Sequence, residues 1–104
     1  MGDFMERFEY IRCFWKYIDD ETPVILFYEV DCLNERYATR MTEVFPDRSA
    51  EPVTEFGFDF VTDAPVPSVD EINREPEFFA EVISKEVFEA AYACQEYRGP
   101  LSRP

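Results

Sequence analysis

The sequence predicts an α+β fold: a meander of about four antiparallel strands, followed by two C-terminal helices packed on one face of the sheet. Strand-like patterns fill the first sixty or so residues, and helix-capping serines appear only later in the chain. Strands followed by helices, rather than alternating with them, favour this class. The 104 residues are the size of one domain. We expect a single domain over residues 1–104, with an ordered core over about 9–98 and flexible ends at 1–8 and 99–104.

The first expected strand, residues 9–17, alternates between two sets of side chains. One face would carry Ile11, Cys13, Trp15 and Tyr17, and the other Tyr10, Arg12, Phe14 and Lys16.

Three further segments have strand patterns. Residues 24–30 begin with a continuous apolar run, typical of a central strand covered on both faces. Residues 36–45 are rich in β-branched and aromatic residues. Residues 51–61 alternate most regularly, and their aromatic face would carry Phe56, Phe58 and Phe60. We expect residues 76–83 to be a turn followed by a short extended piece.

Two helices are expected after the strands. Ser68 and Glu71 form a capping-box pattern that begins a short helix, and Pro76 stops it. Ser84 begins the last helix, over residues 85–98. Its inward stripe would consist of Val87, Phe88, Ala91, Tyr92 and Cys94.

The charge balance excludes several classes of function. The chain has 23 acidic and 10 basic residues, a net charge of −13. Nucleic acids and anionic membranes bind clustered Lys and Arg, so we expect neither as a ligand and a basic protein as the natural partner. Histidine is absent, which removes the commonest general base and zinc ligand. Carboxylate pairs such as Asp19–Asp20 arise from composition alone. We therefore predict a non-enzymatic protein with no catalytic residue, no metal site and no cofactor.

The sequence also indicates a cytoplasmic protein. The N-terminal residues lack the apolar segment of a secretory signal, and no apolar run approaches the ~18 residues of a membrane span. An odd number of widely spaced cysteines favours free thiols in or near the core. These cysteines are Cys13, Cys32 and Cys94.

Rows of acidic residues are the first candidate binding site. On the fourth strand, alternate positions carry Glu51, Glu55, Asp59 and Asp63. On one face of the last helix, the sequence places Glu86, Glu89 and Glu96. Ordered carboxylates imitate the charge of a nucleic-acid backbone and would attract a basic protein. A solvated surface with no partner would show the same pattern.

The aromatic residues offer a second candidate. Eighteen Phe, Tyr and Trp residues are many for one small core. Some would either complete that core or act as interface anchors. Our second choice for a binding face is Tyr10, Arg12 and Phe14. If the sheet face with Tyr10, Arg12, Phe14 and Lys16 is uncovered, it would instead pair with a second copy of the chain.

Five sequence blocks resemble those of a small uncharacterised bacterial domain family. The blocks are Tyr10 to Trp15, Pro23 to Asp31, Arg40 to Asp47, Pro67 to Ile72, and Glu81 to Phe88. The resemblance implies one soluble acidic domain, and it brings no activity, cofactor or catalytic residue. The chain departs from the family pattern at Arg48, where the family turn usually has Gly, and in the aromatic and acidic segment 50–63.

Together these features predict an acidic inhibitor or immunity-type binding protein. It would neutralise a basic, nucleic-acid-acting bacterial protein, either a toxin or a defence component. Small acidic families often include immunity proteins encoded beside toxins, which is an analogy of class only. The alternative is a structural or accessory domain that self-associates as a homodimer.

Overall fold

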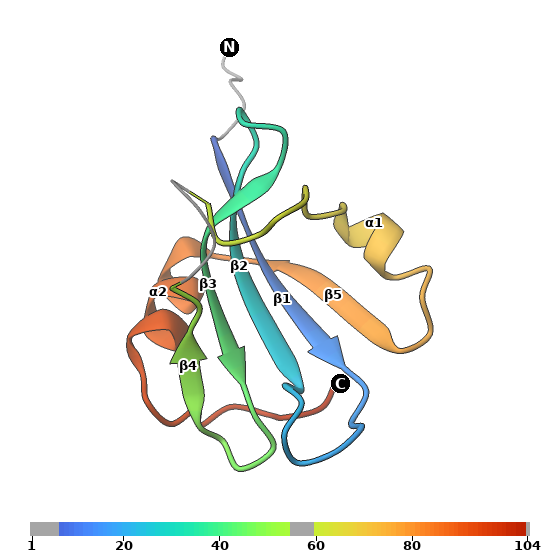
Figure 1. Cartoon of the computed structure of the whole chain (residues 1–104), viewed down its shortest axis with the longest axis vertical. Coiled ribbons are helices and arrows are strands. Elements are labelled where there is room, and N and C mark those ends of the chain that lie inside the picture. The colour runs from blue at the N-terminus through green and yellow to red at the C-terminus, as the bar shows by residue number, and fades with distance from the viewer. Residues whose placement is uncertain (1–6, 55–59, 104) are drawn as a thin grey trace.

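The structure is a computed structural model that describes residues 7–54 and 60–103. A sheet of five antiparallel strands and two helices make up the described chain (Figure 1). In chain order these elements are β1 (Phe8–Trp15), β2 (Ile25–Asp31), β3 (Tyr37–Val44), β4 (Ala50–Pro52), α1 (Val69–Ile72), β5 (Phe78–Ile83) and α2 (Lys85–Ala93). The predicted α+β class is confirmed. The predicted strand count is too low, because residues 78–83, expected to be a short extended piece, form a fifth strand of the sheet.

The strand order in the sheet is β4-β3-β2-β1-β5. The first four strands form the predicted meander, and β5 pairs with the free edge of β1. To reach that edge, the chain after residue 60 crosses in front of β3, β2 and β1 and then forms α1 (Figure 1). Strand β2 is central and buried on both faces, as its continuous apolar run predicted.

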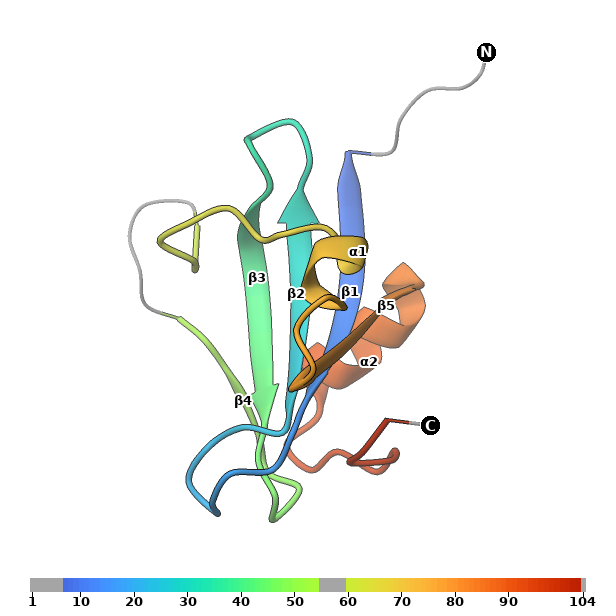
Figure 2. The same cartoon turned by 90° about the vertical axis from the view of Figure 1, so that its right-hand side faces the viewer.

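The two helices cover opposite faces of the sheet, so the prediction that both pack on one face is wrong. Phe88 and Ala91 of α2 belong to a core cluster with Tyr10, Phe14 and Phe27. Helix α1 packs against the other face, whose buried side chains include those of residues 11, 13 and 26 (Figure 2). Both faces of β1 carry apolar side chains. If both helices packed on the same face of the sheet, the apolar side chains on the opposite face would be exposed to water.

Trp15 lies on the α1 face and packs beside Phe78, with 5.5 Å between ring centroids.

The fourth expected strand is much shorter than its sequence pattern predicted. Strand β4 contains three residues and ends at Pro52, and one further bond, from the Val53 N–H to the Met41 carbonyl, follows it. Phe56 and Phe58 lie outside the described residues. Phe60 is described and packs on Tyr37, with ring centroids 5.3 Å apart.

Helix α2 ends at Ala93, five residues before the predicted end. The chain after it forms hydrogen bonds with the β3–β4 turn: the Ala50 N–H donates to the Gln95 carbonyl, and the Tyr97 N–H donates to the Arg48 carbonyl. The Tyr97 ring also packs against Phe27. These tertiary contacts compete with continuation of the helix. Val87, expected to point inward, is 43% exposed.

The β3–β4 turn has a residue with positive φ. The Arg48 N–H donates to the Phe45 carbonyl, and Arg48 has φ 76°. A tight turn followed by a left-handed residue is a common three-residue hairpin, and glycine is the usual residue there. Arg48 occupies this position, and its Nη1 donates to the carbonyls of Tyr97 and Gly99.

The outer edge of β5 is capped by a side chain. The Asn73 amide donates to the Ala80 carbonyl at 3.0 Å and accepts from the Ala80 N–H at 2.6 Å. These are the two bonds that a neighbouring strand would make. The capped edge is therefore a poor template for pairing with another strand.

Candidate functional site

An ion pair between a partly exposed arginine and a buried carboxylate connects β2 and β3. Glu29 of β2 is 7% exposed, and Arg40 of β3 binds it with two hydrogen bonds of 2.9 and 2.7 Å. The register shifts by one residue between Glu29 and Val30, so Glu29 pairs with Arg40 while Val30 pairs with Ala38. This bulge places the extra residue, Thr39, beside the same carboxylate.

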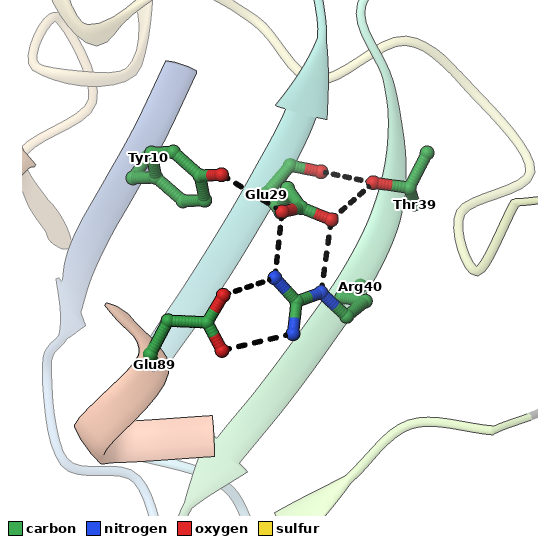
Figure 3. A network of polar contacts seen from close by, with 5 residues as sticks. All are labelled: Tyr10, Glu29, Thr39, Arg40 and Glu89. Atoms are coloured by element: carbon green, nitrogen blue, oxygen red, sulfur yellow. Dashed lines mark hydrogen bonds and ion pairs between the residues drawn. The ribbon is translucent and has the colours of Figure 1, made fainter. Parts of the chain in front are cut away.

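Three more side chains complete a network around this pair (Figure 3). The Thr39 hydroxyl donates to Glu29 Oε1 at 2.7 Å, and the Tyr10 hydroxyl donates to Oε2 at 2.9 Å. Arg40 also donates to both oxygens of Glu89 on α2, at 3.1 and 2.6 Å. The Arg40 guanidinium lies over the rings of Phe88 and Tyr92, 5.1 Å from each centroid. The network thus fastens α2 to the sheet.

The network keeps Glu29 ionised. Hydrogen bonds from Arg40, opposed by burial and assisted by those from Thr39 and Tyr10, lower the pKa of Glu29 to about 2. Burial and the hydrogen bond to Glu29 raise the pKa of Tyr10 to about 12. A carboxylate with such a pKa and four donors is a poor base at neutral pH. The arrangement is suited to a structural role rather than to proton transfer.

An apolar groove lies on the opposite face, between the sheet and α1. Its volume is about 450 Å³. Cys13, Trp15, Leu26 and Tyr28 line it from β1 and β2. The other lining residues are Val66, Pro67, Glu71, Ile72, Glu75 and Phe78.

Two polar groups in this groove are held neutral by burial. Burial raises the pKa of the Cys13 thiol to about 12 and also raises the pKa of the Tyr28 hydroxyl. A thiol with such a pKa is unreactive at neutral pH. The groove is therefore an apolar surface rather than a nucleophilic site.

The comparison with protein families identifies one family, whose model covers nearly all of the elements described above. The family model described as "Domain of unknown function (DUF6881)" matches residues 9–96, which is most of the chain. The chain belongs to this family. The expected resemblance to a small uncharacterised domain family is thereby confirmed. Searches of curated proteins and of solved structures found no match to this chain.

The acidic rows predicted for this DUF6881 domain are only partly described. Glu55 and Asp59 lie outside the described residues. Glu51 on β4, Asp63 in the linker and Glu86 in the first turn of α2 are all exposed.

The predicted helix row is not formed. Glu89 pairs with Arg40 in the network. Glu96 lies beyond the end of α2, pairs with Arg98 and forms an isolated bridge with Ser49. The three acids therefore do not share one helix face.

The second candidate face of the DUF6881 domain is covered. Tyr10 and Phe14 are buried beneath α2, with 9% and 5% exposure. Arg12 is half-buried and pairs with Glu81 at 2.6 Å. The possibility that this sheet face is uncovered is excluded, because α2 packs over Tyr10 and Phe14.

Sequence reasoning missed the buried carboxylates. Asp31 is 1% exposed and accepts from Arg7 Nη2 at 3.0 Å and Asn34 Nδ2 at 2.7 Å; the hydrogen bond from Arg7 lowers its pKa. The signal was present: Glu29 and Asp31 end an apolar strand, where a charge requires a partner. No group of three or more potential metal ligands occurs in residues 7–54 and 60–103, nor is any helix there long and apolar enough to cross a membrane.

Proposed function

We propose that this DUF6881 domain is a small acidic, non-enzymatic binding protein that neutralises a basic bacterial protein acting on nucleic acid, either a toxin or a defence component. The supporting observation is that several of the few basic residues form ion pairs within the fold. Four arginines pair with buried or half-buried carboxylates: Arg7 with Asp31, Arg12 with Glu81, Arg36 with Glu9, and Arg40 with Glu29. These four arginines stabilise the fold. Because they are engaged there, few positive charges remain near the exposed acidic residues.

The exposed acids occur on several elements. They include Asp19, Asp20 and Glu21 between β1 and β2, Glu51 on β4, Asp70 and Glu71 on α1, Glu75 and Glu77 before β5, and Glu86 on α2. A negative field around a small rigid body accelerates encounter with a cationic partner and weakens as salt rises. An inhibitor of this kind would act by covering the cationic surface that its partner uses for nucleic acid.

The experiment begins with the genes adjoining the one that encodes this chain. Each neighbour is expressed from an inducible promoter in a bacterial host, with and without the DUF6881 domain. We expect one neighbour to arrest growth or to restrict phage, and we expect the domain to relieve that effect. The purified pair should bind with an affinity that falls by about tenfold or more between 50 and 300 mM NaCl.

A charge-reversal variant tests whether the predicted acidic row contributes to binding. Glu55→Lys with Asp59→Lys should weaken that complex while leaving the thermal unfolding midpoint nearly unchanged. A domain that neutralises no neighbour, or whose complex is indifferent to salt, would contradict the proposal.

A further inference from the structure

We propose that the apolar groove between α1 and the sheet is the docking site for a basic protein segment that presents apolar side chains flanked by Lys or Arg. This inference rests on the proposed function and specifies the surface that carries it. Of the predicted acidic residues that the structure describes, none lines the groove.

The groove floor has the chemistry of an interface anchor site. Trp15, Tyr28 and Phe78 expose part of their rings there, beside Leu26 and Ile72. Aromatic and aliphatic surfaces of this kind dominate binding energy where a partner side chain fills them and excludes water. A volume of about 450 Å³ would receive two or three apolar side chains.

Acidic residues border the groove on two sides. Glu71 and Glu75 line it from α1 and the following loop. On the other side, the register pairs Leu26 with Glu43 and Glu43 with Glu51. Cross-strand partners share a face, so these acids lie about 5 and 10 Å beyond Leu26 at the usual strand spacing. No Lys or Arg among the described residues lines the groove.

Three of the four border acids have no ion-pair partner in the part of the chain that the structure describes, whereas Glu71 is held by the capping box with Ser68. The ion pairs among residues 7–54 and 60–103 do not include Glu43, Glu51 or Glu75. Glu43 faces Glu51 directly, and burial together with this like charge raises the pKa of Glu43. A cation from a partner would relieve the repulsion. The occupant is therefore basic at its edges and apolar at its centre.

The reporter for the test is Trp15, the chain's single tryptophan. The probes are two synthetic tryptophan-free peptides: an amphipathic leucine–lysine helix and its counterpart with every leucine replaced by serine. We expect the leucine–lysine peptide to shift Trp15 emission to shorter wavelengths and to saturate. The serine–lysine peptide should bind at least about tenfold more weakly, because it lacks the anchors.

Two variants with the same change in charge distinguish binding in the groove from attraction to the overall negative charge of the domain. The variants are Glu75→Lys and Glu86→Lys. Glu75 borders the groove, whereas Glu86 lies on α2, on the opposite face of the sheet, and both residues are exposed. We expect Glu75→Lys to weaken binding of the leucine–lysine peptide by about fivefold or more, and Glu86→Lys by less than about twofold. Circular dichroism of both variants checks that the fold is retained.

Each other outcome overturns the groove assignment. Equal weakening by the two variants, or equal binding of the two peptides, would mean that general charge attraction suffices. The proposed function would then stand without this groove. Failure of both peptides to bind would also reject the groove, and the test with neighbouring genes would decide the proposed function separately.

Discussion

Arg40 binds Glu29 through two parallel hydrogen bonds, Nε to Oε1 at 2.9 Å and Nη2 to Oε2 at 2.7 Å, across the bulge between β2 and β3. The same guanidinium binds Glu89, so one arginine connects the sheet to α2. The Glu29 carboxylate is charged and shielded from water. Removing its partner would therefore lower the free energy of unfolding.

Removing the arginine should therefore destabilise the fold strongly. Arg40→Met leaves the Glu29 charge buried without its main partner, and we expect the free energy of unfolding to fall by about 3 kcal/mol. Urea denaturation measures this. The control is Arg98→Met, which removes an exposed pair with Glu96 and should cost less than about 1 kcal/mol. Equal losses in the two variants would contradict a structural role for the network.

The network also predicts a loss of stability in acid. The pKa of Glu29 is depressed to about 2 in the folded protein, so its contribution is complete above the unfolded pKa of about 4.3 and is lost as pH falls toward 2. Arg40 is partly exposed, so we expect this contribution to be about 2 kcal/mol. Urea midpoints between pH 7 and pH 2 should fall more steeply for the wild type than for Glu29→Gln. Parallel curves would show that other carboxylates govern the acid response.

The β3–β4 turn predicts an order of stability among variants of one residue. Arg48→Ala keeps the strained positive φ and loses the side-chain hydrogen bonds to Tyr97 and Gly99. Arg48→Gly loses the same bonds and relieves the strain, so it should be about 1 kcal/mol more stable than Arg48→Ala. Both should be less stable than the wild type in thermal unfolding. A glycine variant no more stable than the alanine variant would contradict the assigned backbone conformation.

The cap on the β5 edge predicts a local effect. Asn73→Ala leaves the N–H and carbonyl of Ala80, which is 2% exposed, without their partner. We expect a loss of about 1–2 kcal/mol and faster hydrogen exchange at the Ala80 amide. Asn73→Asp keeps an acceptor for the N–H and should be intermediate. Unchanged exchange at Ala80 in the alanine variant would rule out the cap.

Two threonines on β3 predict opposite results for the same substitution. Thr42 is fully buried, and its hydroxyl has no hydrogen-bond partner in the part of the chain that the structure describes. Thr42→Val removes an unsatisfied polar group and should stabilise the fold by about 1 kcal/mol. Thr39→Val removes a donor to Glu29 and should destabilise by a similar amount. Urea denaturation of both variants tests this, and destabilisation by Thr42→Val would indicate that its hydroxyl has a partner.

Several parts of the fold follow from short stretches of sequence. The alternation around Ile11 and the apolar run after Pro23 predicted strands, because side chains change face at every residue. The Ser68–Glu71 capping box is formed as predicted, since its hydrogen bonds span only three residues. Ser84 likewise caps the N-terminus of α2. Each of these signals is complete within a few residues.

Other parts depend on contacts between distant segments. The end of α2 depends on hydrogen bonds between the β3–β4 turn and the chain after the helix, such as that from Arg48 to Tyr97, 49 residues away. The pairing of β5 with β1, and hence the placement of α1 and α2 on opposite faces, depends on the same kind of contact. Only the tertiary structure shows that Glu29 is buried with Arg40 while Glu75 is left to border a groove. By itself, the sequence determined which segments alternate, which serines begin helices and how negative the chain is, because those properties are local or additive. The tertiary structure decided which acids are neutralised and which face outward, because the charge near each carboxylate depends on residues far away in the chain.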